Sequence, residues 1–348
     1  MLKRKCNNTD IEFSVMGTGC WAFGGGDYWG SQNQKDVTKV VHAAVDFGIN
    51  YFDTAEAYNE GRSELSLGKA IKDLSRDKLI IGTKISPSNC YPDKIDAHCH
   101  ASLERLGTDY IDMYMIHWPI HPHSIKHFTK DSDVILNPPR IEEAIEGLRK
   151  LKKDGKIRHF GVSNFARTRM DDLPLSEIAV NELPYNLLCR AIEYDILPYC
   201  QKNGIGVISY MALLQGVLTG VYPNLDDVPK WRRRTRHFNS TNSVECRHGE
   251  SGVEQETNRA LHEIGSLSNE TGIKMSDLAI KWILENSGVT CTLVGSRNIE
   301  QLKENVKALD ITITAETKRA LDVITAPIME KLGNHFDYYE SAQKDRTI

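Results

Sequence analysis

Short apolar runs rich in β-branched residues alternate along the chain with longer amphipathic segments. A run of about four to eight such residues between turn signals is typical of a buried strand, whereas apolar residues three and four positions apart predict a helix. Strands are therefore expected at 12–19, 49–53, 79–84, 109–117, 159–164, 178–182, 205–210 and 291–296. Helices are expected at 35–48, 64–74, 93–107, 140–155 and 191–204.

This alternation predicts an α/β fold, with a parallel sheet covered by helices. Eight strands favour a closed (β/α)8 TIM barrel, here with a capping strand pair at the N-terminus and an extra helix at the C-terminus. The alternative is a doubly wound open sheet, which normally carries a glycine-rich turn that leads directly into a helix. Residues 17–26, GTGCWAFGGG, are glycine-rich but contain Trp21 and run on into a polar loop, so they do not fit that fingerprint.

One barrel domain is expected to span residues 1–348. The rhythm is interrupted at about 215–253, where no period is sustained, and long loops in compact domains are usually functional or disordered. This loop follows the seventh strand, so it belongs to the face on which barrel enzymes carry their active sites. The tail at about 328–348 is charged and aromatic, and either folds over the barrel mouth or frays.

Charge and composition narrow the classes of partner. The net charge is −4, so no overall positive field attracts nucleic acid or an anionic membrane. No apolar run approaches the roughly 18 residues of a membrane span, and the first residues turn polar too early for a signal peptide. Eight cysteines stand singly without a CxxC pair, which indicates free thiols in a reducing compartment. We expect a cytoplasmic protein that acts on a small molecule; the oligomeric state stays open.

Ionisable side chains stand at the ends of the predicted strands, which converge on one site in a barrel. Asp53, Lys84 and His117 each end an apolar strand, and Tyr58 follows Asp53 by five positions. An ammonium beside a tyrosine stabilises the phenolate and lowers the tyrosine pKa, and Asp53 can hold that ammonium in place. His117 can bond the reacting oxygen. The four side chains suit carbonyl reduction, in which a proton is donated to oxygen as hydride arrives at carbon.

These residues lie in motifs that resemble the aldo-keto reductases: FDTAEAY, GTKI, MIHWP, GVSNF and VGSRNIEQLKEN, in that order, between about residues 10 and 325. The resemblance implies a (β/α)8 barrel that binds NADPH in extended form without a dinucleotide-binding sheet. It also implies a catalytic tetrad of Asp53, Tyr58, Lys84 and His117, with Tyr58 as general acid in reduction and base in oxidation. The implied activity is an NADP-dependent interconversion of an aldehyde or ketone and an alcohol.

The resemblance also implies a set of cofactor contacts. Ser163 and Asn164 match the pair that bonds the nicotinamide carboxamide, and the Tyr210 ring matches the one that stacks on the nicotinamide. Contacts near the reacting end are expected from Gly19, Cys20, Trp21 and Asp53, and contacts along the loop that covers the pyrophosphate from Met211, Leu213, Gln215, Gly216 and Leu218. Gly295, Ser296, Arg297, Gln301 and Asn305 match the positions around the 2′-phosphate and adenine. The Arg297 guanidinium suits a phosphate, so NADP(H) is expected over NAD(H).

Glu182 departs from the family pattern, because many members have glutamine at the end of this strand. A carboxylate accepts hydrogen bonds but donates none, so the carboxamide would have to turn its NH2 group toward it. This substitution leaves the fine positioning of the nicotinamide open.

The resemblance further implies that Trp21, Tyr58, His117 and Trp118 line the substrate pocket, although the two tryptophans could instead be packed at the rim of the barrel. The polar candidates Asp27, Tyr28, His121 and His123, together with a likeness to bacterial-type branches that handle sugars and inositols, favour a small sugar- or polyol-like substrate. Glu56 has no place in the motifs and is expected to be solvated.

Other interpretations of the same residues remain. Four histidines in 117–128 suggest a metal, but prolines should break any helix there and no fixed ligand face results, so no metal site is expected. The cationic run WRRRTRH, 231–237, is either a solvated loop or a contact for cofactor phosphates or an anionic or polyol substrate. The rival function is a non-catalytic NADPH-binding sensor or scaffold, resembling potassium-channel β subunits. A phosphate-binding barrel isomerase is a weaker rival, because GSR at 295–297 is too short a phosphate loop.

Overall fold

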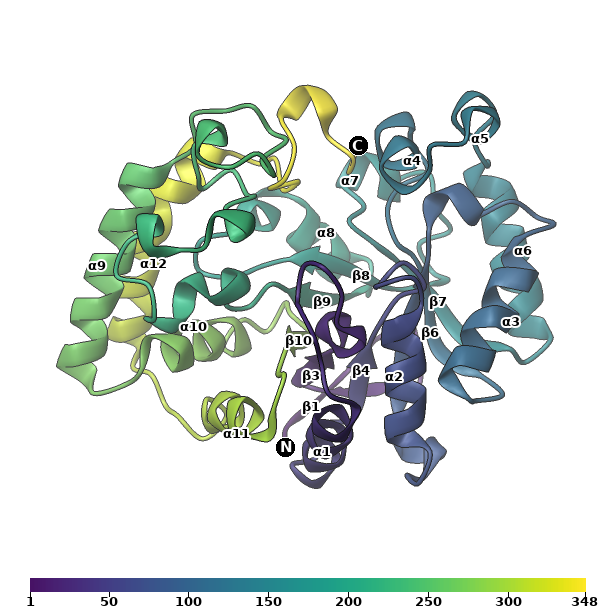
Figure 1. Ribbon diagram of the computed structural model, residues 1–348, viewed down its shortest axis with the longest axis horizontal. Helices are drawn as coiled ribbons and strands as arrows, with labels where there is room; N and C mark the ends of the chain where they lie inside the picture. Colours follow the sequence, from purple (N-terminus) through teal and green to yellow (C-terminus); the bar gives the residue numbers. More distant parts are fainter.

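Eight parallel strands close into a barrel in the computed structural model, which describes residues 1–348 (Figure 1). In the order of the barrel these are β10 (Cys291–Val294), β3 (Met16–Gly19), β4 (Tyr51–Asp53), β5 (Ile80–Ile85), β6 (Ile111–Ile116), β7 (Ile157–Ser163), β8 (Ile178–Pro184) and β9 (Gly206–Tyr210). The first and last strands pair with each other, with Thr292 opposite Met16. This closure confirms the (β/α)8 barrel and excludes the open sheet.

The predicted strand at 12–19 is two strands with different partners. β1 (Lys3–Lys5) and β2 (Glu12–Ser14) form an antiparallel pair, whereas β3 belongs to the barrel. Phe13 on β2 packs edge-on against Tyr51 inside the barrel, with 4.9 Å between ring centroids. The capping strand pair is thus confirmed. Because it plugs the amino-terminal end of the barrel, the carboxyl ends of the strands form the open mouth.

Twelve α-helices surround the barrel: α1 (Gln34–Asp46), α2 (Arg62–Ile71), α3 (Ile95–Leu106), α4 (Pro122–Phe128), α5 (Ser132–Leu136), α6 (Ile141–Lys153), α7 (Arg167–Met170), α8 (Ile196–Lys202), α9 (Glu254–Thr271), α10 (Met275–Leu284), α11 (Ile299–Lys307) and α12 (Ala315–Leu332). Apart from α4 and α5, these helices contribute buried apolar residues to the main hydrophobic core, which covers the outside of the strands. None of these helices is both long enough and apolar enough to span a membrane.

Proline explains two differences from the predicted helices. The expected helix at 191–204 is divided into a 3-10 turn, Ala191–Tyr194, and α8. In a continuous helix the nitrogen of Pro198 would have to donate to the carbonyl of Tyr194, and proline has no N–H. Conversely, the expectation that prolines exclude a helix within 117–128 is wrong. Pro122 occupies the first turn of α4, where its missing N–H needs no partner.

The long loop and the C-terminal tail lie together over the barrel mouth. The loop contains four short 3-10 turns, at Leu214–Thr219, Leu225–Asp227, Lys230–Arg232 and Ser240–Asn242. The yellow tail that follows α12 runs beside the green loop in Figure 1, and the backbone N–H of Arg236 donates to the carbonyl of Tyr338. The tail therefore folds over the mouth instead of fraying.

Candidate active site

Lys84 lies at the centre of a buried polar cluster inside the mouth. Asp53 and Lys84 project inward from the adjacent parallel strands β4 and β5. The Lys84 ammonium donates to both carboxylate oxygens of Asp53, at 2.7 and 2.6 Å, and to the carbonyl of Thr54 at 2.9 Å. It also donates to the Tyr58 hydroxyl at 3.3 Å. The side chain of Lys84 is fully buried, so its charge depends on Asp53.

Tyr58 and His117 face each other across this cluster. Tyr58 lies in the loop after β4, and His117 directly follows β6. Their rings meet edge to face with 5.4 Å between centroids, and the Trp21 ring lies 5.8 Å from that of Tyr58. The buried Nδ1 of His117 has no hydrogen-bond partner. The structure thus brings Asp53, Tyr58, Lys84 and His117 together as the sequence predicted.

The pKa of Tyr58 is raised in the structure, whereas the sequence predicts that Lys84 lowers it. Burial raises the pKa of Tyr58, and the nearby charge of Lys84 only partly offsets this rise. Burial disfavours the ammonium of Lys84, but the charges of Asp53 and Glu182 outweigh it and raise the Lys84 pKa. Burial and the Lys84 charge hold the pKa of His117 well below its usual value. At neutral pH the cluster therefore contains a protonated tyrosine, an ammonium and a neutral imidazole.

Glu182 is a second carboxyl group beside the Lys84 ammonium, which already pairs with Asp53. Its Oε1 lies 3.4 Å from the Lys84 nitrogen, a longer contact than those Lys84 makes with Asp53, Thr54 and Tyr58, and its buried Oε2 has no partner. Burial and the charge of Asp53 raise the pKa of Glu182 well above its usual value. The buried site therefore favours the protonated form of Glu182 over the carboxylate. In that form its O–H is a donor, which a carboxylate lacks.

The predicted nicotinamide contacts form a connected polar group beside Glu182. Asn164 donates from its side chain to the carbonyl of His117 at 3.2 Å and to the Ser163 hydroxyl at 2.9 Å. The hydroxyl of Tyr210 donates to Oδ1 of Asn164 at 2.7 Å. Ser163 in turn donates to the backbone carbonyl of Glu182 at 3.2 Å. These bonds hold the side chains of Ser163, Asn164 and Tyr210 in fixed orientations at the ends of β7 and β9, on either side of β8.

The start of the long loop has an unusual backbone. The φ angles of Met211, Gln215 and Gly216 are 63°, 54° and 101°, in the left-handed region that non-glycine residues rarely adopt. Side-chain bonds support this turn, because Gln215 donates to the Tyr339 hydroxyl at 2.8 Å and accepts from that of Tyr28 at 2.5 Å. Leu213 and Leu218 are the remaining predicted contacts on this segment, and Leu218 is buried. The loop start is thus fastened to both the tail and the β3–α1 segment.

The predicted adenosine contacts gather at the start of α11. Arg297 donates to the Gln32 side chain at 2.9 Å and to the carbonyl of Ser31 at 2.6 Å, and forms no ion pair. Asn305 donates to the hydroxyl of Ser296 at 3.0 Å, while Gln301 accepts from the backbone of Arg297 at 2.8 Å. An unpaired guanidinium at a helix N-terminus suits a phosphate.

Between the two ends, Gly19 and Gly295 leave the surface open. A Cβ placed on either glycine would meet nothing closer than 3.8 Å. Cys20, which follows Gly19, is fully buried. The residues present therefore fit an extended dinucleotide that runs from Tyr210 past Gly19 to Arg297.

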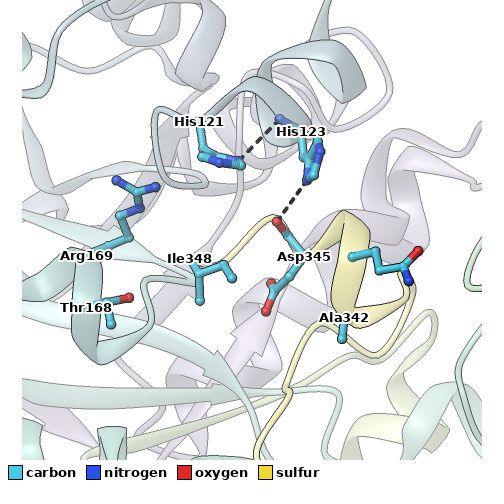
Figure 2. A pocket seen from close by; sticks show the side chains of 8 residues that line it. His121, His123, Thr168, Arg169, Ala342, Asp345 and Ile348 are labelled. Carbon is cyan, nitrogen blue, oxygen red and sulfur yellow. Dashed lines mark hydrogen bonds between the residues drawn. The ribbon is translucent and has the colours of Figure 1, made fainter.

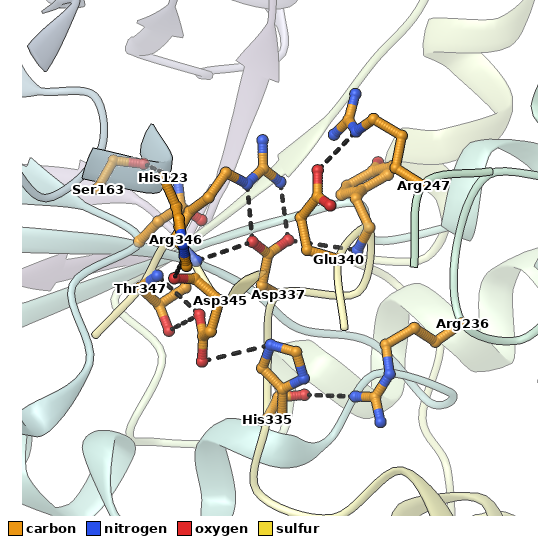
Figure 3. Close-up of polar contacts among 12 residues, drawn as sticks. His123, Ser163, Arg236, Arg247, His335, Asp337, Glu340, Asp345, Arg346 and Thr347 are labelled. Atoms are coloured by element: carbon orange, nitrogen blue, oxygen red, sulfur yellow. Dashed lines mark hydrogen bonds and ion pairs between the residues drawn. The ribbon is translucent and has the colours of Figure 1, made fainter. Parts of the chain in front are cut away.

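The tail contributes a residue that the sequence analysis missed. Arg346 is 4.0 Å above the Trp118 ring and forms a buried two-bond ion pair with Asp337, at 2.7 Å for each bond (Figure 3). Trp21, on the other side of the mouth, is stacked on Tyr28. No periodic pattern marks Arg346, and only the charged character of the tail could have drawn attention to it.

His121 and His123 lie in a cavity of about 370 Å³ between α4, α7 and the tail, whose lining includes Thr168, Arg169 and Asp345 (Figure 2). The cavity is separate from the polar cluster, because its lining includes none of Asp53, Tyr58, Lys84 and His117. No group of three or more His, Cys, Asp or Glu side chains is placed to hold a metal ion.

Glu56 is not solvated, contrary to expectation. Its side chain is only 8% exposed and pairs with His98 at 2.8 Å. It also accepts from the backbone of Ser86 and the side chain of Asn89, each at 2.8 Å. Glu56 therefore joins the loop after β4 to the segments that follow β5, and so supports the position of Tyr58.

Comparison with known proteins agrees with this geometry. Residues 15–326 match the model of the Aldo/keto reductase family. The NADH-specific methylglyoxal reductase of Escherichia coli (strain K12) is 33% identical over 335 residues, which cover 90% of this chain and 95% of that protein. The structure of the glycerol dehydrogenase AKR11B4 from Gluconobacter oxydans superposes with a TM-score of 0.74 at 30% identity, covering 93% of this chain and 95% of that one.

An aldo-keto reductase from Klebsiella pneumoniae in complex with NADPH has a TM-score of 0.69 at 26% identity and covers 99% of both chains. The agreement extends over nearly the whole barrel and includes every strand that contributes to the cluster around Lys84. The chain belongs to the aldo/keto reductase family, whose members interconvert carbonyl compounds and alcohols.

Proposed function

We propose that this protein reduces an aldehyde or ketone to an alcohol with NADPH, and catalyses the reverse oxidation, with Tyr58 as the general acid and base. The observation that carries the proposal is the Tyr58 hydroxyl, which lies 3.3 Å from the Lys84 ammonium and faces His117 at the open end of the barrel. No side chain in the cluster offers a nucleophile with its own base.

When bound, the nicotinamide cofactor would supply the hydride for the carbonyl carbon. As charge develops on the carbonyl oxygen, Tyr58 donates its proton, and the Lys84 ammonium stabilises the phenolate that remains. Asp53 keeps Lys84 charged and fixed. His117 is neutral, so it orients the carbonyl oxygen by hydrogen bonding and does not compete as an acid.

Ser163, Asn164 and Tyr210 would hold the nicotinamide end, the segment from Met211 to Leu218 the pyrophosphate, and Ser296 to Asn305 the adenosine end. Arg297 favours NADPH, because its guanidinium has only neutral partners and a 2′-phosphate would supply the missing anion. Protonated Glu182 would donate to the carboxamide as the glutamine of other members would.

The substrate is a small polar carbonyl compound of sugar or polyol type. Support comes from the polar mouth around Tyr28 and Gln215, and from the relatives named for methylglyoxal and glycerol. A cytoplasmic location is proposed because the eight cysteines are unpaired thiols.

The test is the loss of NADPH absorbance with 4-nitrobenzaldehyde and methylglyoxal, with NADH in parallel and glycerol plus NADP+ for the reverse reaction. The proposal predicts turnover of at least one carbonyl substrate, faster with NADPH than with NADH. Quenching of protein fluorescence by NADPH without turnover of any substrate would favour the sensor or scaffold instead. Faster turnover with NADH would contradict the assignment of Arg297.

A further inference from the structure

The long loop and the tail bring six arginines to the barrel mouth, and four of them have acidic partners. Arg233 pairs with Asp226 at 3.6 Å, Arg236 with Glu250 at 2.8 Å, Arg247 with Glu340 at 2.6 Å and Arg346 with Asp337 at 2.7 Å. Figure 3 shows Arg346 with Asp337 and Arg247 with Glu340, and it shows Arg236 beside His335. Arg232 and Arg234 are the exceptions, because neither forms an ion pair. In addition, the buried Nε of each has no hydrogen-bond partner.

Arg232 has a role within the loop. It donates to the carbonyl of Gln215 at 3.2 Å and to the hydroxyl of Tyr222 at 3.3 Å. Its guanidinium is thus part of the support for the strained turn at the loop start. Arg234 has no such bond, and its guanidinium carbon lies 5.1 Å from the centroid of the Tyr28 ring. A partly buried cation without an anionic partner is unfavourable. A ligand that carries an anionic group would therefore gain binding energy from the Arg234 guanidinium.

An aromatic wall connects Arg234 to the reacting group. The Tyr28 ring is stacked on Trp21 with 5.1 Å between centroids and 5° between planes. Trp21 is in turn 5.8 Å from Tyr58. A flat or extended substrate lying along this wall would have one end at the Tyr58 hydroxyl and the other end near Arg234.

We propose that Arg234 binds an anionic group, a carboxylate or a phosphate, at the far end of the carbonyl substrate. This inference rests on the proposed reductase function and names a class of substrate for it. Because two rings separate Tyr58 from Arg234, the anion must be distant from the carbonyl. An acid directly beside the carbonyl, as in glyoxylate, does not reach Arg234 and gains nothing from it.

The experiment measures kcat/KM for 4-formylphenoxyacetate and for its amide, which has the same shape without the charge. Wild type, Arg234→Gln and Arg234→Lys are compared, together with Lys230→Gln, which removes an exposed charge from the same loop. The acid-to-amide ratio of kcat/KM is expected to fall on the order of tenfold or more in Arg234→Gln, the size of a lost charged hydrogen bond. It should fall less in Arg234→Lys and stay within about twofold in Lys230→Gln, because an exposed charge interacts weakly.

Three results would overturn the inference. The acid-to-amide ratio of kcat/KM could be unchanged in Arg234→Gln, or it could fall equally in Lys230→Gln. The third is that Arg234→Gln lowers kcat/KM for glyoxylate as much as for 4-formylphenoxyacetate. Turnover of the amide by the wild type separates this failure from failure of the reductase function. If the wild type reduces the amide but the ratio does not depend on Arg234, only the anion site is wrong. If it reduces neither compound but turns over 4-nitrobenzaldehyde, the anion site is wrong and the reductase function stands. If it reduces none of the three, both proposals fail.

Discussion

Replacing Glu182 with glutamine tests whether this buried carboxyl carries a proton at neutral pH. The two side chains have nearly the same size and shape, so the substitution removes the titration without opening a cavity. Lys84 makes closer contacts with Asp53, Thr54 and Tyr58, so an ionised Glu182 would be left with one 3.4 Å contact and a buried oxygen without a partner. The titratable groups that face Glu182 from the surrounding elements are Tyr51, Asp53, Tyr58, Lys84, Tyr210 and Cys291.

The magnitude follows from proton linkage. The pKa of Glu182 is raised in the folded protein, so above its usual value of 4.5 the folded chain keeps a proton that the unfolded chain has lost. The stability contribution of Glu182 is therefore complete below pH 4.5 and declines as the pH rises toward the folded pKa. Over that window one extra bound proton lowers the free energy of unfolding by about 1.4 kcal/mol per pH unit. The glutamine variant lacks this decline.

The assay is urea unfolding of wild type and Glu182→Gln between about pH 5.5 and 7.5, with the free energy of unfolding extrapolated to water. The difference, variant minus wild type, should rise with pH by up to about 1.4 kcal/mol per unit until the pH reaches the pKa of Glu182 in the folded protein. Glu143→Gln is the control, since Glu143 is exposed on α6 and forms no ion pair. Two parallel pH profiles for wild type and Glu182→Gln would refute the reasoning, because they would mean that Glu182 is already ionised.

Two further variants test other parts of the site. Arg297→Gln should weaken NADPH binding on the order of tenfold or more, as for a lost charged hydrogen bond, and weaken NADH binding much less; fluorescence titration measures both, and an equal loss for the two cofactors would contradict the 2′-phosphate assignment. Asp337→Asn leaves Arg346 buried without its partner, which costs up to about 3–5 kcal/mol unless the tail opens locally. Limited proteolysis should then cut the tail faster than in wild type, and an unchanged cleavage rate would mean that the pair does not hold the tail closed.

The sequence predicted the barrel and the cluster around Lys84 because both follow from position along the strands. A residue at the carboxyl end of a barrel strand points to the mouth, so Asp53, Lys84 and His117 could be placed together without knowledge of any contact. The charge state of Glu182 could not be predicted in this way. It depends on which acceptors occupy the three N–H groups of Lys84, and those come from β4 and the loop that follows it.

The wrong and missing assignments have the same cause. The sequence indicates a solvated Glu56, but the partner of Glu56, His98, is 42 residues away on α3. Arg346 and Asp337 pair within a tail that has no periodic pattern. In both cases the side chains are buried by contacts between segments whose meeting cannot be predicted from the sequence. Strands and helices, by contrast, have a periodic pattern of apolar residues that predicts them.

The central claim is that Tyr58 delivers the proton in carbonyl reduction. The most direct measurement compares wild type with Tyr58→Phe for single-turnover oxidation of bound NADPH by 4-nitrobenzaldehyde, with NADPH affinity measured separately by fluorescence. The account predicts that the variant binds NADPH as wild type does but reacts at least roughly a hundredfold more slowly, the contribution of a positioned general acid. A variant that binds NADPH and reacts at the wild-type rate would contradict the account.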